Sequence, residues 1–260
     1  MRLLHHTVSF DNKIIELILE RFDETEVSYK IMSLLLSATK IRGLLNFLRV
    51  IESMIALIIY LPIPIISSLF IRYVNRLSGP IGYYLRSLYF RQKAHYIGSN
   101  VLIGQNVVVS QVSKLSLDDF AYLDRDVNIM CKATVGKRCH LAVGCFFSGG
   151  GELIIEDYAS LGMRSVVLTS SDSPAKGYRG SGPMIPILER KVVSGKTIFR
   201  KDAFTGPLTL VFPGIVMNVG SVLAGGSVLR RNTKEWGVYL GNPAKQVSWR
   251  DPIVSQPTTN

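Results

Sequence analysis

The sequence has few of the residues on which metal sites and disulfide frameworks depend. Its 260 residues include only three cysteines and four histidines. Cys131, Cys139 and Cys145 form no CxxC pair, and no paired histidines accompany them, so no metal site is expected. We expect them to be small apolar fillers in a reducing compartment.

Charged residues are also scarce, at 19 % of the chain, and the acidic ones are scarcer still, which leaves a net charge of +11. A basic surface favours anionic partners such as phosphorylated cofactors, phosphorylated sugars or anionic lipid. The alternative interpretation is a general excess of charge, as soluble proteins often have, with no particular partner. The basic residues are dispersed and no nucleic-acid-binding motif accompanies them, so no nucleic-acid partner is expected. No secretory signal pattern is visible, which predicts a cytoplasmic location.

Residues 1–90 are expected to be helical. Lys13–Phe22 has apolar residues at helical spacing, and residues 41–73 form a long apolar run flanked by arginines. Pro62 and Pro64 interrupt that run, which argues against a single membrane span. Two interpretations stay open: an element lying in a membrane interface at the inner face of the cell membrane, or a helical subdomain covering the end of the following domain.

A six-residue period begins at Ile97. Every sixth residue from there to Cys145 is apolar, and with 47 % hydrophobic residues nine such matches in one frame have a probability of about one in a thousand. A two-residue insertion at Gly149–Gly151 resets the frame, which continues at Leu153, Ala159 and Ser165. The second run is Val193, Phe199, Thr205, Val211, Met217, Leu223 and Leu229.

This period fits neither a helix nor an open β-meander. It fits a coil with three short flat faces, each pointing one residue inward, and a rise of about 4.8 Å per coil. Glycine often follows the inward residue, as at Gly98 and Gly104, because a tight corner tolerates it best. The predicted fold is therefore mainly β: a parallel β-helix of hexapeptide repeats with an N-terminal helical region and a short C-terminal segment.

The end of the array resembles a known family. Phe212-Pro213-Gly214, the coil Ala224–Leu229 and the segment Gly241-Asn242-Pro243-Ala244-Lys245 follow one another as in the left-handed β-helix, hexapeptide-repeat acyltransferases. The resemblance covers about residues 79–250 and is nearest to bacterial polysaccharide and O-antigen sugar O-acetyltransferases. It implies a homotrimer with acetyl-CoA lying along the coils in a groove between subunits.

The resemblance also implies site residues. Gly206, Ala224, Gly225 and Gly226 match the wall along which the pantetheine lies, because small side chains let it approach the backbone. Arg230 and Lys245 match positions near the CoA phosphates, where a cation attracts phosphate. Simple corner residues and a solvated basic face are the alternative interpretations.

The predicted loop 169–192 interrupts the array and is expected to carry the acceptor site. In relatives that modify polysaccharide sugars, a loop histidine removes the proton from the sugar hydroxyl. Here Ser170 stands at that position, and Asp202 stands where a second histidine is expected. Asp172, Asp202 and His140 are the remaining candidate bases, although an ordinary carboxylate is a weak one.

The predicted domains are 1–90, helical; 91–250, the β-helix with its loop; and 251–260, a tail. The function expected first is O-acetyl transfer from acetyl-CoA to a sugar hydroxyl of a bacterial surface polysaccharide or its precursor. Transfer to the amine of an amino sugar nucleotide is a close variant, since an amine loses its proton more readily. A catalytically degenerate trimeric scaffold is the alternative from another class.

Overall fold

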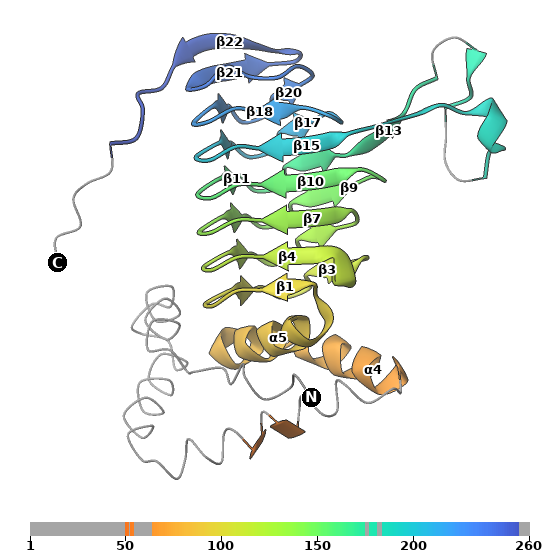
Figure 1. Ribbon diagram of the computed structural model, residues 1–260, viewed down its shortest axis with the longest axis vertical. Coiled ribbons are helices and arrows are strands. Elements are labelled where there is room, and N and C mark those ends of the chain that lie inside the picture. The colour runs from red at the N-terminus through yellow and green to blue at the C-terminus, as the bar shows by residue number, and fades with distance from the viewer. Residues whose placement is uncertain (1–49, 52, 55–63, 175–176, 181–183, 255–260) are drawn as a thin grey trace. The chain divides into compact units, whose positions relative to one another are not determined.

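The computed structural model describes residues 50–51, 53–54, 64–174, 177–180 and 184–254 (Figure 1). The predicted helix over 13–22 and most of the apolar run 41–73 lie outside these residues. The chain divides into two compact units, residues 1–92 and 93–260. In the part of the chain that is described, no helix combines the length and the hydropathy that crossing a bilayer requires.

In the first unit, α4 (Pro64–Val74) and α5 (Gly79–Lys93) are joined by a short turn. The guanidinium of Arg86, on α5, is fully buried and donates to the carbonyl oxygens of Val74 (2.9 Å) and Leu77 (2.7 Å). These carbonyls belong to the end of α4 and its turn, where helix acceptors lack intrahelical partners and a cation is favoured. The arginine thus fixes the end of α4 to α5.

The second unit is a parallel β-solenoid of about seven turns, as predicted (Figure 1). Six successive coils each contribute one short strand to each of three sheets, here called A, B and C, in which these strands run parallel, and a last hairpin extends sheet B. Sheet A contains β1 (Tyr96–Ile97), β4 (Leu115–Leu117), β7 (Lys132–Val135), β10 (Glu152–Ile155), β15 (Lys196–Phe199) and β18 (Val216–Met217). Sheet B contains β2 (Leu102–Ile103), β5 (Tyr122–Leu123), β8 (His140–Leu141), β11 (Ser160–Leu161), β16 (Phe204–Thr205) and β19 (Val222–Leu223), and then the hairpin β21 (Gly237–Gly241) and β22 (Ala244–Trp249). Sheet C contains β3 (Val108–Val109), β6 (Asn128–Ile129), β9 (Phe146–Ser148), β12 (Val166–Leu168), β17 (Leu210–Val211) and β20 (Val228–Leu229).

The core is built from two inward residues per face rather than one. Leu115 and Leu117 both lie inside, and so do Leu153 and Ile155, each at most 1 % exposed. The predicted insertion at Gly149–Gly151 is confirmed, because Lys132 pairs with Glu152, 20 residues later, where three hexapeptides would give 18.

A second two-residue insertion escaped prediction. Tyr96 pairs with Ser116, again 20 residues on, and the extra residues accompany the short 3-10 helix Val112–Lys114. Each face has two inward residues, and both are apolar. Before this insertion the six-residue count falls on the second of them, and after it on the first, so the count showed no interruption. Val193 was wrongly placed in the array, since it lies on an exposed strand outside the coils and is 47 % exposed.

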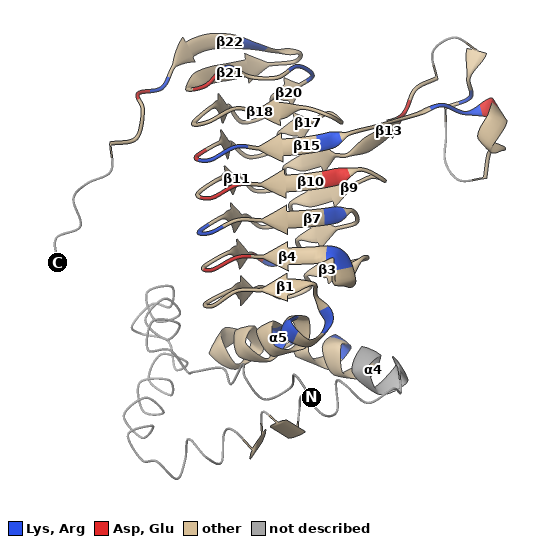
Figure 2. Ribbon diagram, in the orientation of Figure 1, with Lys and Arg blue, Asp and Glu red and all other residues tan. Residues whose placement is uncertain are grey.

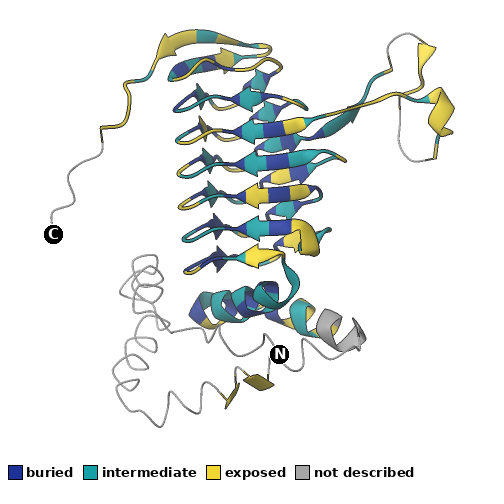
Figure 3. Ribbon diagram, viewed as in Figure 1, coloured by how far each residue is buried: buried dark blue, intermediate teal, exposed yellow. Residues whose placement is uncertain are grey.

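The loop forms an arm that leaves the solenoid at the corner between sheets C and A. Its base is an antiparallel pair, β13 (Ser170–Asp172) with β14 (Val192–Ser194), and a 3-10 turn, Ile187–Glu189, lies further out. Figures 1 and 3 show the arm projecting with mostly exposed residues. Its hydrophobic side chains contribute little to the core, since Met184 is 92 % exposed and Leu188 is 89 % exposed.

Outward residues of sheet A carry an alternating charge ladder (Figure 2). Glu152 accepts from Lys132 at 2.9 Å and from Lys196 at 3.1 Å, one coil to either side. The two ammonium groups lower the pKa of the Glu152 carboxyl. Exposed pairs of this kind contribute little to stability. Their main effect is to place opposite charges side by side when neighbouring coils pair in the observed register.

Candidate active site

The corner between sheets B and C carries residues with little or no side chain in four successive coils. They are Ala142, Gly162, Gly206 and Ala224, each directly after its strand of sheet B. A Cβ on Gly162 would lie 2.4 Å from the carbonyl carbon of Gly206, and a Cβ on Gly206 would lie 2.5 Å from the nitrogen of Gly225. Backbone therefore packs against backbone along this corner, here called the BC row.

Hydrogen bonds hold the BC row together from both sides. Gly206 N–H donates to the carbonyl of Leu223 (2.7 Å), and Gly226 N–H donates to that of Pro207 (2.9 Å). From the interior, the buried hydroxyl of Ser165 donates to the carbonyl of Gly206 (3.1 Å). The predicted cofactor residues Gly206, Ala224, Gly225 and Gly226 thus come together in the structure, with Gly225 and Gly226 exposed.

His140 lies on the outer face of sheet B in the coil that contains Ala142. Its ring stacks on that of Tyr122, one coil earlier, with centroids 4.9 Å apart and planes within 5°. Its Nε2 lies 3.6 Å from Oδ2 of Asp124, an ion-pair distance rather than a hydrogen bond. Among the described residues Nε2 has no hydrogen-bond partner, although this atom is buried.

The Asp124 carboxyl faces opposing effects. Burial raises its pKa, but the neighbouring imidazole of His140, the Arg125 N–H and the Tyr122 side chain together hold the pKa below its ordinary value. The carboxyl is therefore ionised at neutral pH and can stabilise a positive charge on His140. The pair lies next to the BC row, which makes His140 the predicted base best placed for that row.

Sequence inspection missed Asp124 and Tyr122. One signal could have found them: Tyr122 and His140 are 18 residues apart, one regular coil, so they must be neighbours on one sheet. Applying the coil length to outward residues as well as inward ones would have joined this cluster.

The arm residues lie at a different corner. Ser170 and Asp172 are on β13, at the corner between sheets C and A, and the Ser170 hydroxyl accepts from the N–H of Gly150 (2.8 Å). That bond ties the arm to the coil below, a structural use of the hydroxyl. Within one chain, the arm and the BC row are separated by the width of sheet C.

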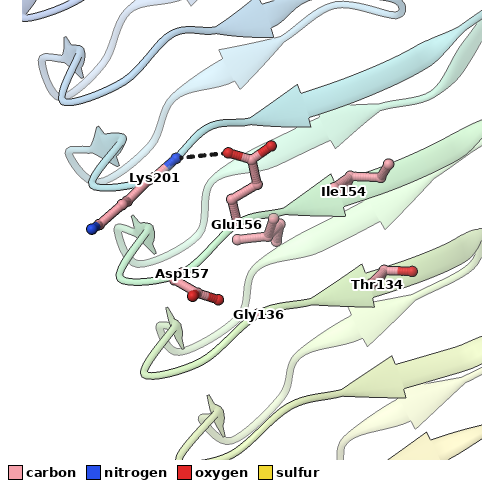
Figure 4. Close-up of a pocket in the computed structure, with 7 residues that line it drawn as sticks. Thr134, Gly136, Ile154, Glu156, Asp157 and Lys201 are labelled. Atoms are coloured by element: carbon pink, nitrogen blue, oxygen red, sulfur yellow. Dashed lines mark hydrogen bonds between the residues drawn. The ribbon is translucent and has the colours of Figure 1, made fainter.

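Asp202 lies at the third corner, between sheets A and B, as a corner residue with φ of 59°. The shallow pocket in Figure 4 opens near this corner and is lined by Glu156, Asp157 and Lys201 among others. Its carboxylates are occupied by backbone: Glu156 accepts from Lys201 N–H (3.1 Å) and Asp157 accepts from Lys137 N–H (2.8 Å). These carboxylates tie adjacent coils together, so both have a structural role. Asp202 is therefore not brought together with Ser170, Asp172 or His140 within one chain.

The two predicted phosphate ligands are placed differently. Lys245 is exposed on β22, opposite Leu240 of β21, and so continues sheet B beyond the BC row. Arg230 is exposed at the far end of sheet C, with its guanidinium 4.6 Å from the ring centroid of Phe212. Lys245 thus lies on sheet B, whereas Arg230 lies at the end of sheet C that is remote from the BC row.

The three cysteines are buried and unpaired with one another. Burial raises the pKa of Cys131 to about 11 and those of Cys139 and Cys145 to about 12. Thiols of this kind are not nucleophiles near neutral pH. In the described part of the chain, no group of three or more His, Cys, Asp or Glu could hold a metal ion.

No family model matches the sequence. A curated relative, dTDP-4-amino-4,6-dideoxy-D-glucose acyltransferase of Escherichia coli, is 26 % identical over 157 residues, which cover 57 % of this chain and 81 % of the relative. Among solved structures, AntD, an N-acyltransferase from Bacillus cereus in complex with dTDP and 3-hydroxybutyryl-CoA, is similar with a TM-score of 0.59 and 24 % identity, covering 61 % of this chain and 85 % of AntD. A maltose O-acetyltransferase from Clostridium difficile 630 is similar with a TM-score of 0.51 and 16 % identity, and the match covers 71 % of this chain and 84 % of the maltose O-acetyltransferase.

The two solved structures share the fold, and the curated relative adds similarity in sequence. All three are named as acyl- or acetyltransferases. The hexapeptide array, the β-solenoid and these relatives together fit a hexapeptide-repeat sugar acetyltransferase family.

Proposed function

We propose that this chain is a CoA-dependent acyltransferase that moves an acetyl group from acetyl-CoA to the amine of an amino sugar nucleotide. The observation that carries the proposal is the BC row with His140 and Asp124 beside it. Gly225 and Gly226, which follow the row, offer exposed backbone for a long ligand, and the pair offers a proton acceptor. The curated relative, named for a dTDP-amino sugar, favours an amine as the acceptor.

The BC row fits the donor because its residues carry little or no side chain, so a ligand on the outside can approach the backbone beside Ala224 closely. The N–H groups of Gly206, Ala224 and Gly226 donate within the solenoid, so the exposed Gly225 and the carbonyl oxygen of Gly226 are the groups that can bond to the amides of pantetheine. Lys245, beyond the row on sheet B, is suited to the CoA phosphates, and Arg230 would reach them only around the edge of sheet C. The thioester of the donor supplies an acyl group activated toward attack by an amine or a hydroxyl.

His140 is the proposed base. An amine that attacks the thioester carbonyl forms the new amide bond and must lose a proton, while CoA leaves as the thiol. The imidazole at the edge of the BC row can take that proton, and ionised Asp124 stabilises the imidazolium that results. Ser170, Asp172 and Asp202 are not needed for this step. Within one chain they lie at other corners of the solenoid than the BC row.

A sugar hydroxyl is the second candidate acceptor, and the same pair favours it. A hydroxyl is a much weaker acid than an ammonium group, so its acetylation depends strongly on a positioned base. His140 held against Asp124 is such a base even though the position expected on the arm holds Ser170. The two acceptors therefore predict different sensitivities to loss of His140.

The test is to purify the full chain and measure release of the CoA thiol from acetyl-CoA with dTDP-4-amino-4,6-dideoxyglucose or with maltose as acceptor. His140→Asn is expected to lower kcat by about 10²–10⁴-fold with a hydroxyl acceptor, and by less with an amine. Ala224→Phe, which places a ring on the row, should raise KM for acetyl-CoA at least about tenfold, a loss of about 1.4 kcal/mol in binding. Lys196→Phe, exposed on sheet A, is the matched control and should leave KM unchanged.

A degenerate scaffold makes the opposite prediction. Acetyl-CoA at about 100 times its Kd would stabilise a binding protein by about 2.7 kcal/mol, a shift that thermal melting detects readily. If acetyl-CoA leaves Tm unchanged and no acceptor releases CoA, the proposal is wrong and the solenoid serves a structural role.

A further inference from the structure

We propose that the exposed face of α4 and its following turn docks on an anionic lipid bilayer. The face consists of Leu69, Arg72, Tyr73 and Arg76, here called the α4 face. These residues are spaced i, i+3, i+4 and i+7, which places them on one side of a helix. The turn continues past Val74, because Arg76 N–H donates to the carbonyl of Tyr73 at 3.0 Å.

The α4 face is exposed and is half apolar, half cationic. Leu69 is 59 % exposed and Tyr73 66 %, and both arginines are exposed, whereas Val74 on the other side is fully buried. Ile81, at the start of α5, is also 58 % exposed. An aliphatic residue and a tyrosine between arginines suit the boundary between headgroups and acyl chains.

The sequence around α4 commits this face to an anionic partner. From Ser53 to Leu117 there is no aspartate or glutamate, while Arg72, Arg76, Arg86, Arg91 and Lys93 all occur. The formal charges within residues 53–117 of the sequence are therefore all positive. The apolar residues before α4, from Met54 onward, extend the same character along the sequence.

The helix is held in a form suited to lying on a surface rather than crossing it. Its 11 residues span about 16 Å, roughly half of a hydrocarbon core. The buried Arg86 fixes the end of α4 to α5, and a Cβ on Gly82 would lie 2.3 Å from the carbonyl oxygen of Leu77. The α4 face is therefore presented by a braced helix pair.

Co-sedimentation of the full chain with vesicles tests the proposal. Vesicles of phosphatidylcholine with about 30 % phosphatidylglycerol supply the anionic surface, and pure phosphatidylcholine vesicles supply the neutral one. Binding is expected only to the anionic vesicles, and it should weaken as the Debye length falls from about 10 Å at 0.1 M salt to about 3 Å at 1 M. Arg72→Gln with Arg76→Gln should lower the partition coefficient about 30-fold, because each arginine near such a surface contributes roughly fivefold.

Two further variants separate the apolar and the cationic contributions. Leu69→Ser with Tyr73→Ser should lower anionic-vesicle binding about tenfold or more while keeping the salt dependence. Lys132→Gln with Lys196→Gln removes the same charge from sheet A of the solenoid and should leave binding unchanged. Circular dichroism and acetyl transfer in solution, which the proposal does not require to change, show that each variant is folded.

Three results would overturn the proposal. The first is no binding of the folded chain to anionic vesicles. The second is binding that the two α4 variants leave intact. The third is a fall in oligomeric mass of those variants by light scattering without vesicles, which would make the α4 face a contact between copies of this chain.

Discussion

The backbone contact between Gly206 and Gly225 makes a sharp prediction about Gly206→Ala. Real side chains essentially never place a Cβ as close as the 2.5 Å at which this one would meet the nitrogen of Gly225. The atoms in the way are backbone, so neither can rotate aside. The two coils must separate at the corner, and this separation would weaken two hydrogen bonds, from Gly206 to Leu223 and from Gly226 to Pro207.

The expected cost follows from these contacts. Overpacking costs about 1–3 kcal/mol, and two lost hydrogen bonds cost about 1 kcal/mol each. Gly206→Ala should therefore destabilise the chain by about 3–5 kcal/mol. For a domain of this size, that lowers Tm by about 6–20 °C.

The matched control is Gly150→Ala, the same substitution at another corner. There the nearest atom to a new Cβ is the Ser170 hydroxyl oxygen at 4.0 Å, and φ is not positive. Alanine in open space restricts the unfolded chain, so Tm should be unchanged or slightly higher. Scanning calorimetry gives both values, and KM for acetyl-CoA should rise for Gly206→Ala alone. Equal melting temperatures for the two variants would refute the backbone packing described for the BC row.

Three other outcomes are expected. The pKa of Asp124 is lower in the folded chain than in the unfolded one, so the ionised carboxylate stabilises the fold above the unfolded pKa, and this stability is lost as pH falls through the folded pKa. Asp124→Asn should therefore flatten the decline of Tm below about pH 5, and parallel curves of Tm against pH for the two chains would contradict this. The three cysteines should not react with a thiol reagent at pH 8 until the chain is unfolded in guanidinium, since their pKa values are about 11 to 12; prompt labelling of the folded chain would show that they are accessible. Ser170→Ala removes the acceptor of the Gly150 N–H and should lower Tm by about 2–4 °C with kcat nearly unchanged; a large loss of kcat at constant Tm would instead place Ser170 in the chemistry.

The solenoid was predictable because its inward residues repeat a short-range requirement. Each face of each coil must point small or medium apolar groups into a narrow interior, so apolar residues recur along the sequence with the period of the faces. The prediction was coarse in one respect: Leu115 and Leu117 are both inward, and a count by six cannot tell the first from the second. For this reason the insertion near Val112–Lys114 went unseen, and Val193 was assigned to a coil that it does not form.

The reason given for the corner glycines was also incomplete. Gly98 and Gly104 do not adopt positive φ, yet a Cβ on either would lie within 2.7 Å of the next coil. The left-handed positions of this first coil are instead Asn100 and Asn106. The glycine is needed for close approach between coils, a tertiary contact that a single corner does not reveal.

Outward residues follow no such repeat, and the candidate site is made of outward residues. The sequence offered no reason to separate the candidates Ser170, Asp202 and His140. In the structure they lie in three different places: the corner between sheets C and A, the corner between sheets A and B, and the outer face of sheet B. Which corner a residue occupies depends on every insertion before it in its coil. The positions aligned by resemblance therefore named residues without showing that they could meet.

The same separation explains how an acyltransferase solenoid can lack a histidine on its arm. Substitutions of outward residues leave the stacked interior intact, because inward and outward residues alternate along each short strand. A base can consequently be supplied from any outward position that borders the BC row. His140 borders it, stacked on Tyr122 and facing Asp124. The loss at Ser170 therefore counts against a particular arrangement of the site and not against acyl transfer itself.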